Sequence, residues 1–187
     1  MVSLPLLLIL VTLVSADWFW GGCPSPRPMP EFEPEAYTGL WHDVMRTKDL
    51  PYKTSGTCPR SYYVKEDDDH FSVLAEALYD TEWHTYKDYQ YWTGNEGKLN
   101  VCSSTAKTSC SETTILDTDY ETYSVIWSCH EGWFGLWHHE YSWVLARNIM
   151  FFGEFVEQII TDATSLEKDD LEAPENHHCP DDGQTNN

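Results

Sequence analysis

The stretch YTGLWHDVMR, residues 37–46, decides the fold. Within it Gly39 stands two residues before Trp41, at the start of a run of strand-forming residues. Glycine allows the backbone to turn tightly at this point, while the large indole swings beneath the turn. The stretch therefore predicts the beginning of a first strand, with a buried ring at its base.

Further strands are predicted outward from this stretch at short, regular spacing. Phe71, Val73 and Ala75 alternate with Ser72 and Glu76, which is typical of a half-buried strand. The predicted strands are 39–46, 60–65, 70–77, 83–93, 99–101, 112–117, 123–129 and 140–147. In the predicted strand 83–93, large aromatic rings stand at both odd and even positions, so its inward and outward faces cannot be assigned. Eight strands with hairpin-length links predict an all-β fold, an antiparallel up-and-down barrel that closes on itself.

One segment near the C-terminus has helical spacing instead. Apolar residues recur from Phe155 through Val156, Ile159 and Ile160 to Ala163, with polar residues between them. This pattern predicts one helix packed outside the barrel, with an apolar face that needs an apolar partner. We expect residues 168–187 to be held only by Cys179, with a flexible acidic tail at 180–187.

The composition limits the partners. At 187 residues the chain suits one domain, predicted at 37–179. The chain has 11 Lys and Arg against 31 Asp and Glu, for a formal net charge of −20. Such a surface repels phosphate backbones, so no nucleic-acid partner is expected.

Export is predicted from the N-terminus and the cysteines. Residues 1–16 are apolar and end in small residues, as a signal peptide does, which predicts a secreted, extracellular protein. Residues 17–36, rich in Pro, Gly and aromatics, should form an extended N-terminal arm. Six cysteines in an exported chain indicate disulfides, although spacing alone leaves the pairing open.

Catalytic and metal-binding signatures are missing from the sequence. It contains no nucleophile elbow, glycine-rich phosphate loop or spaced zinc motif. His138, His139 and Glu140 are adjacent, and neighbours on a strand point to opposite faces, so they should not chelate a metal jointly. We therefore predict no catalytic residue, no metal site and no enzyme activity.

Three stretches together resemble the lipocalin family. They are residues 37–46, LDTDYETY at 116–123 and WVLARN at 143–148, in the family's order and spacing. The resemblance implies an eight-stranded calyx, with an arginine lying over the tryptophan ring at its closed end. It assigns the structural base to Gly39, Trp41, Thr118, Asp119, Tyr120 and Arg147. It also implies the pairs Cys23–Cys129 and Cys58–Cys179, which leaves Cys102 with Cys110 to close a short loop.

The resemblance implies a ligand pocket at the opposite, open end. Counting alternate residues from the base predicts an apolar wall with a few hydroxyls. The predicted lining is Tyr62, Phe71, Val73, Ala75, Thr113, Ile115, Ser124, Ile126, Tyr141, Trp143 and Leu145. Tyr62 is preferred over Tyr63, although a one-residue gap beside Cys58 would reverse that parity. The alternative is that these side chains simply fill a narrow barrel.

A loop at the predicted open rim, residues 131–139, carries Trp133, Phe134, Leu136 and Trp137. Exposed apolar clusters commonly mark contact sites, and the resemblance implies that this one docks on a lipoprotein or membrane surface. The alternative is a lid folded over the ligand. The sequence does not separate them.

Taken together, these features predict a secreted carrier for a small hydrophobic ligand, such as a fatty acid or sterol, with no cofactor required. An alternative is a pigment protein that binds a bilin, such as biliverdin, or a carotenoid, because pigment lipocalins share these motifs. Two further alternatives are an enzyme acting on a polyene or prostanoid, and an interaction protein with a filled barrel.

Overall fold

The structure, a computed structural model, describes residues 18–48, 50, 56–92, 94–151, 153–177, 179 and 180. The predicted signal peptide and residues 181–187 of the predicted tail lie outside the described residues. Among the described residues, no helix has the length and apolarity needed to cross a membrane.

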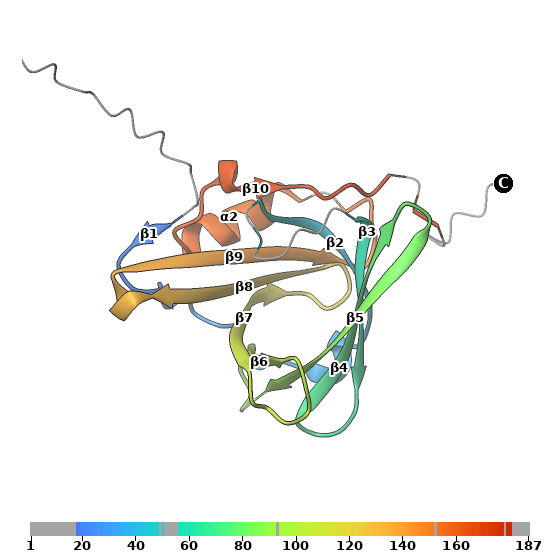
Figure 1. The fold of residues 1–187 in the computed structure, drawn as a ribbon, viewed down its shortest axis with the longest axis horizontal. Helices are drawn as coiled ribbons and strands as arrows, with labels where there is room; N and C mark the ends of the chain where they lie inside the picture. Colours follow the sequence, from blue (N-terminus) through green and yellow to red (C-terminus); the bar gives the residue numbers. More distant parts are fainter. Residues whose placement is uncertain are drawn as a thin grey trace, which may run out of the picture.

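Eight antiparallel strands form a closed barrel, as predicted (Figure 1). Each strand pairs with its neighbours in sequence, and the first and last close the barrel through hydrogen bonds between β2 and β9. The strands are β2 (Gly39–Thr47), β3 (Thr57–Lys65), β4 (His70–Tyr79), β5 (Glu82–Trp92), β6 (Lys98–Cys102), β7 (Cys110–Thr118), β8 (Tyr123–Gly132) and β9 (Trp137–Ala146). Closure leaves no long unpaired edge for aggregation.

Two short strands extend the sheet beyond the barrel. β1 (Phe19–Trp20), in the N-terminal arm, pairs with the start of β9, and the arm ends in the short helix α1 (Pro34–Tyr37). β10 (Leu171–Glu172), which follows the 3₁₀ turn η2 (Lys168–Asp170), pairs with the end of β2. The expectation that only Cys179 holds the tail is therefore wrong, because backbone pairing and a hydrogen bond from Asn176 Nδ2 to Asp43 O (2.8 Å) also hold it.

The closed end of the barrel is filled by aromatic rings and one guanidinium. Trp41 is fully buried and donates from Nε1 to the carbonyl of Tyr37 at 2.9 Å. The guanidinium of Arg147 lies 3.7 Å from the centre of the Trp41 ring. Gly39 has a φ of +100°, and a Cβ there would come within 3.3 Å of Arg147. Glycine therefore permits both the turn and the approach of the arginine.

Arg147 also fastens the segments that meet at this end. Its guanidinium donates to the carbonyls of Tyr120, Leu40 and Ala36 at 3.0, 2.8 and 3.2 Å. Bonding to three carbonyls makes Arg147 a structural clamp, because a guanidinium donates several hydrogen bonds in fixed directions.

The turn between β7 and β8 is organised by Asp119. Its carboxylate accepts from the backbone amides of Glu121, Thr122 and Tyr123 at 3.1, 2.8 and 3.0 Å. Partial burial acts to raise the pKa of Asp119, but the hydrogen bonds from Thr122 and the turn amides hold it below its usual value. Thr118 completes the turn by donating from Oγ1 to Tyr123 O at 2.6 Å.

Helix α2 (Glu154–Ala163) packs on the outside of the barrel, as predicted. Its buried residues, Val156 and Ile160, belong to one apolar cluster with Val125 and Val144. The cluster lies outside because odd positions of β8 face outward while even positions face in, the two-residue period of a strand. Phe155 is half exposed and contacts Tyr123 instead, with 4.9 Å between ring centres.

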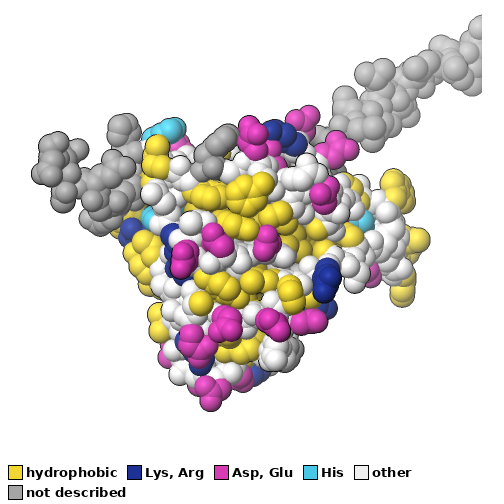
Figure 2. Space-filling model, turned by 180° about the vertical axis from the view of Figure 1, so that it is seen from behind, with side chains coloured by type: hydrophobic (Ala, Val, Ile, Leu, Met, Phe, Trp, Pro, Cys, Tyr) yellow, Lys and Arg dark blue, Asp and Glu magenta, His cyan; other side chains and the backbone are white. Residues whose placement is uncertain are grey.

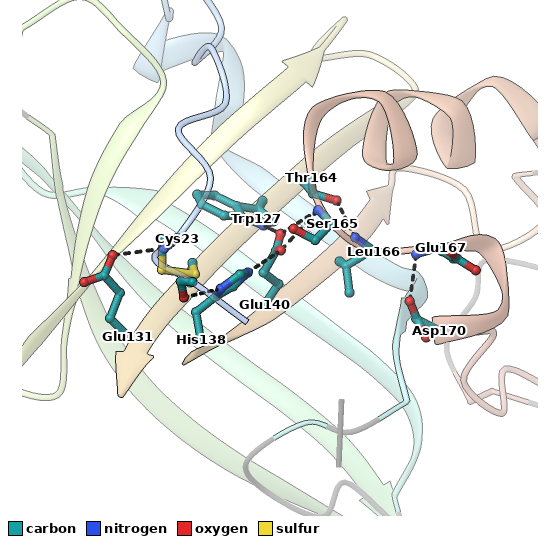
Figure 3. Close-up of polar contacts among 12 residues, drawn as sticks. Cys23, Trp127, Glu131, His138, Glu140, Thr164, Ser165, Leu166, Glu167 and Asp170 are labelled. Carbon is teal, nitrogen blue, oxygen red and sulfur yellow. Dashed lines mark hydrogen bonds and ion pairs between the residues drawn. A yellow bond between two sulfur atoms is a disulfide. The ribbon is translucent and has the colours of Figure 1, made fainter. Parts of the chain in front are cut away.

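A buried carboxylate joins this outer layer to the barrel (Figure 3). Glu140 of β9 has no exposed side-chain surface, and it accepts from Trp127 Nε1 at 2.8 Å and from the Ser165 amide at 3.1 and 3.2 Å. His138 Nε2 lies 3.0 Å from the same carboxylate, and its Nδ1 lies 2.9 Å from Gly21 O in the arm. Glu140 thus ties together two strands, the arm and the chain after α2.

Three disulfides join the pairs expected from the resemblance. Cys23–Cys129 fixes the arm to β8, and Cys58–Cys179 fixes the tail to β3. Cys102–Cys110 closes the loop between β6 and β7. The two long closures limit the unfolded chain most, each by roughly 4 to 5 kcal/mol in the chain-entropy description.

Candidate functional site

Above the filled end, the barrel encloses a cavity of about 670 Å³. Its wall comes from the inward-facing positions of the strands, because alternate residues of a strand point to the same face. Among the predicted lining residues, the structure places Val73, Ala75, Thr113, Ile126, Tyr141, Trp143 and Leu145 on this wall. The barrel is therefore not packed solid along its length.

Three predicted lining residues lie lower, in the filled part of the barrel. Phe71 and Ile115 have no exposed surface and belong to the closed-end cluster with Trp41. Ser124, also fully buried, lies 2.8 Å from the hydroxyl of Tyr37. These residues form the floor beneath the cavity and do not border it.

The preference for Tyr62 is wrong. Tyr63 borders the cavity and is 4% exposed, while Tyr62 lies on the other face near the guanidinium of Arg60. The register explains the difference: Tyr63 pairs with Gly39 of β2. An irregularity in the pairing between Thr57 and Arg60 shifts the strand at the position where the sequence was ambiguous.

The wall contributed by β5 is polar, which the sequence did not reveal. Inward positions of β5 lie opposite those of β4, so Asp88 faces Val73 and Gln90 faces Phe71. Gln90 Nε2 donates to Asp88 Oδ1 at 3.3 Å. Burial raises the pKa of Asp88 to about 6, and the hydrogen bond from Gln90 acts against that rise.

A second carboxyl borders the cavity from β2. Asp43 faces inward because it stands two residues after Trp41, and the pairing irregularity between Asp43 and Met45 brings Arg46 to the same face. Arg46 forms ion pairs with Asp43 at 3.5 Å and with Glu172 at 3.6 Å. Burial raises the pKa of Asp43 to about 7, against the opposing charge of Arg46. Neither residue was predicted to face the cavity: alternation from Trp41 indicates Asp43, but no sequence signal marks the bulge that brings in Arg46.

The predicted rim loop is shorter than expected, because β8 and β9 continue into it. The tip is the 3₁₀ turn η1 (Trp133–Gly135), and Trp137 belongs to β9, paired with Trp20 of the arm. Trp133 and Phe134 are 73% and 96% exposed, and both hold positive φ angles, which are unusual for large residues. Neither borders the cavity, so the tip does not act as a lid here.

Hydrophobic side chains gather at the end of the molecule that this hairpin reaches (Figures 1 and 2). Leu136 is 53% exposed beside the tip, and Trp20 of the arm is 87% exposed. The Trp18 ring lies 3.9 Å from that of Trp137, which continues the apolar surface along the arm. Acidic side chains are interspersed over the rest of the face in Figure 2.

One set of potential metal ligands occurs among the described residues, at the turn between β3 and β4. Asp67, Asp69 and His70 have ligand atoms within 4.8 Å of one another. His70 Nδ1 lies 2.8 and 2.9 Å from the two carboxylates, and Lys107 pairs with Asp69 at 3.4 Å. The three side chains thus satisfy one another in an exposed turn, at the opposite end of the barrel from the cavity mouth.

Known proteins of similar sequence and structure share this architecture. Lazarillo protein of Schistocerca americana is 24% identical over 154 residues, which cover 79% of this chain and 71% of that protein. Apolipoprotein D of Mus musculus is 25% identical over 186 residues, covering 92% of each chain. The crystal structure of lobster apocrustacyanin A1 matches with a TM-score of 0.70 at 19% identity, covering 87% of this chain and 93% of that one.

The chain has the lipocalin fold. Its likeness to apolipoprotein D extends over nearly the whole chain. No protein-family model matches the sequence. The fold, closed base and open cavity of this chain fit the binding of a small ligand inside the barrel.

Proposed function

We propose that this protein is a secreted carrier that holds a small hydrophobic ligand in the barrel cavity without converting it. The single observation that carries the proposal is the cavity of about 670 Å³, bordered by Tyr141, Trp143, Ile126 and Leu145. Enclosing roughly 400 Å² of apolar ligand surface contributes about 10 kcal/mol at about 25 cal/mol per Å². Association costs reduce that gain toward micromolar affinity.

Secretion is supported by the three disulfides. Such bonds persist in oxidising compartments and are rare in reducing ones. No free cysteine is found among the described residues, so a thiol nucleophile has no support there. Binding without chemical conversion is therefore the simplest activity for this site.

Filling the cavity tests the proposal. Ala75 faces the cavity, and its neighbour Leu74 faces outward and is 37% exposed. We expect Ala75→Trp to weaken binding of the ligand extracted from natively purified protein by about 10-fold or more, because the new ring occupies ligand space. Leu74→Trp is the matched control and should bind normally.

Native mass spectrometry of protein from its own source identifies that ligand and separates the alternatives. A fatty acid or sterol supports the carrier proposal in its first form. A coloured protein that releases a bilin or carotenoid identifies the pigment alternative. Absence of any co-purifying molecule would contradict ligand carriage, and an unchanged affinity of Ala75→Trp for a molecule that does co-purify would contradict its binding in the cavity.

The exposed hairpin tip favours a second function, contact with a lipid surface such as a lipoprotein or membrane. Trp133, Phe134 and Leu136 present their side chains to solvent on a projecting hairpin, and amphipathic rings suit a lipid–water boundary. Replacing Trp133 and Phe134 by Ser should reduce co-sedimentation with phosphatidylcholine vesicles by about 10-fold, while ligand affinity stays unchanged. Val64→Ser, at a single exposed apolar residue elsewhere, is the control. Equal co-sedimentation of all three proteins would exclude this function.

A further inference from the structure

The polar wall of the cavity carries information about the ligand's polar group. On β5 the inward positions hold His84, Tyr86, Asp88 and Gln90, opposite the small or apolar residues of β4. The neighbouring inward positions of β6 and β4 at this level, Val101 and Val73, are apolar. The Asp88 carboxyl thus lies in an apolar part of the wall and faces the space that the ligand fills.

Asp88 has few partners within the protein. Its one side-chain hydrogen bond comes from Gln90 at 3.3 Å, and no lysine or arginine among the described residues lies within ion-pair distance of it. Burying an ionised carboxylate is costly unless it is paired, and here the cost is visible as the raised pKa of Asp88. A cationic ligand group would supply the missing partner.

The cavity offers no comparable place for an anionic group. The cation that faces it, Arg46, is engaged by Asp43 and Glu172. Arg60 reaches the edge of the cavity, but its guanidinium lies on the face of β3 that carries Tyr62, where it pairs with Glu76 at 3.0 Å and lies 3.8 Å from the Trp83 ring. A ligand carboxylate would therefore compete with protein carboxylates for a cation and would face Asp43 and Asp88 as like charges.

The other surroundings also favour a cation. Tyr86, Tyr141 and Trp143 border the cavity, and aromatic faces attract ammonium groups. The net charge of −20 raises the local concentration of cations around the protein. These two effects act together with the acidic wall.

We propose that the cavity binds an apolar molecule carrying a protonated amine, with the Asp88 carboxylate as the partner of the ammonium group. This inference rests on the proposed carrier function and narrows its ligand class. It disfavours a free fatty acid, since the acid end would meet the same carboxylate.

Three probes of equal chain length test the proposal: decylamine, decanol and decanoic acid. Binding is measured by isothermal titration at pH 7.5 in 0.15 M salt, which screens long-range attraction. We expect decylamine to bind about 10-fold more tightly than decanol, the value of one charge-assisted interaction, and decanoic acid to bind most weakly. Decanoic acid binding as tightly as decylamine would overturn the proposal.

Variants at the carboxyl locate the effect. Asp88→Asn should weaken decylamine about 10-fold and leave decanol within about 3-fold, while Asp88→Glu keeps the preference for the amine. Asp80→Asn removes the same charge from an exposed turn and should leave all three affinities unchanged. An unchanged decylamine affinity in Asp88→Asn, with its fold verified by circular dichroism, would overturn the role of Asp88.

The pH profile gives an independent readout. Decylamine affinity should rise between pH 5 and pH 7.5 as Asp88 loses its proton, and this rise should disappear in Asp88→Asn. The titratable side chains sharing its strand face are His84 and Tyr86; the inward residues of β4 and β6 beside it carry no charge, and Asp43, Arg46, His130 and Tyr141 border the same cavity. A rise that persists in Asp88→Asn assigns the titration to one of those groups and contradicts the proposal.

The two levels of inference fail differently. If decanol and decanoic acid bind but decylamine does not bind more tightly, only the amine preference is overturned. If none of the three probes binds saturably, the carrier function fails and the amine preference fails with it.

Discussion

Two carboxylates on the same barrel have opposite surroundings. Glu140, on the outer face of β9, accepts hydrogen bonds from Trp127 and Ser165 and contacts His138 (Figure 3). Asp88, on the inner face of β5, has one hydrogen bond, from Gln90. Glu140 has no exposed side-chain surface and is surrounded by donors, whereas Asp88 is half-buried and has a single donor.

The number of donors around each carboxylate indicates whether it serves the fold or the binding site. A buried carboxylate with a full set of donors stabilises one arrangement of the elements that supply them, here two strands, the arm and the chain after α2. A buried carboxylate with a single donor costs stability and persists where another requirement maintains it. On that reasoning Glu140 maintains the fold, and Asp88 belongs to the binding site.

The largest expected loss of stability comes from removing the carboxylate of Glu140, which accepts several hydrogen bonds. Glu140→Ala leaves the Trp127 indole and the Ser165 amide buried without an acceptor, which costs about 3 to 5 kcal/mol of unfolding free energy. For a chain of this size we expect the melting temperature to fall on the order of 10 °C, measured by calorimetry. Ligand affinity in the folded variant should stay the same, because Glu140 lies outside the barrel.

Two companion variants sharpen that measurement. Glu140→Gln keeps one acceptor oxygen and should lose about half as much stability. Glu121→Ala removes an exposed glutamate and should change little. If Glu140→Ala has the same melting temperature as the wild-type protein, the hydrogen bonds in Figure 3 contribute nothing to stability. The structural role assigned to Glu140 would then be wrong.

For Asp88, in contrast, we expect removal of the charge to increase the free energy of unfolding. Asp88 has a folded-state pKa of about 6, above its ordinary value of 3.8, so between those pH values the folded protein holds a proton that the unfolded chain has lost. Its contribution to stability therefore falls as pH rises from about 4 to 6 and stays low above that. Asp88→Asn should stabilise the ligand-free protein by about 1 to 3 kcal/mol at pH 7.5 and by almost nothing at pH 4, measured by urea unfolding. A destabilised variant at pH 7.5 would show that the carboxylate is well satisfied after all.

The sequence predicts features that depend on one segment at a time better than features that depend on how two segments pair. The barrel, the α2 helix and the Trp41–Arg147 base follow from strand periodicity, helical spacing and three spaced stretches. Tyr63 was missed because a pairing irregularity reversed the parity of β3, and Arg46 because an unmarked bulge brought it to the inner face.

The partners of the two carboxylates are harder still to predict. Asp88 could not be oriented while rings occupied both faces of β5. Glu140 depends on Ser165, whose amide reaches it only after α2 has packed on the barrel. Such contacts join segments distant in sequence, and alternation along one strand says nothing about them.

The smallest effect should come from removing the one donor that Asp88 has. Gln90→Met keeps the length of the side chain but deletes the hydrogen bond that holds the pKa of Asp88 down, so that pKa should rise further above 6. Stability at pH 7.5 should fall by less than about 1 kcal/mol, the net value of one such bond. Carboxyl carbon NMR through a pH titration measures the change directly. Gln158→Met, which deletes a similar bond to the exposed Asp162 on α2, leaves the Asp88 titration unmoved. Gln90 lowers the pKa of Asp88 while burial raises it, so removing Gln90 should leave the effect of burial unopposed. If the pKa of Asp88 falls in Gln90→Met instead, burial is not what raises that pKa. The difference between Asp88 and Glu140 would then need another cause.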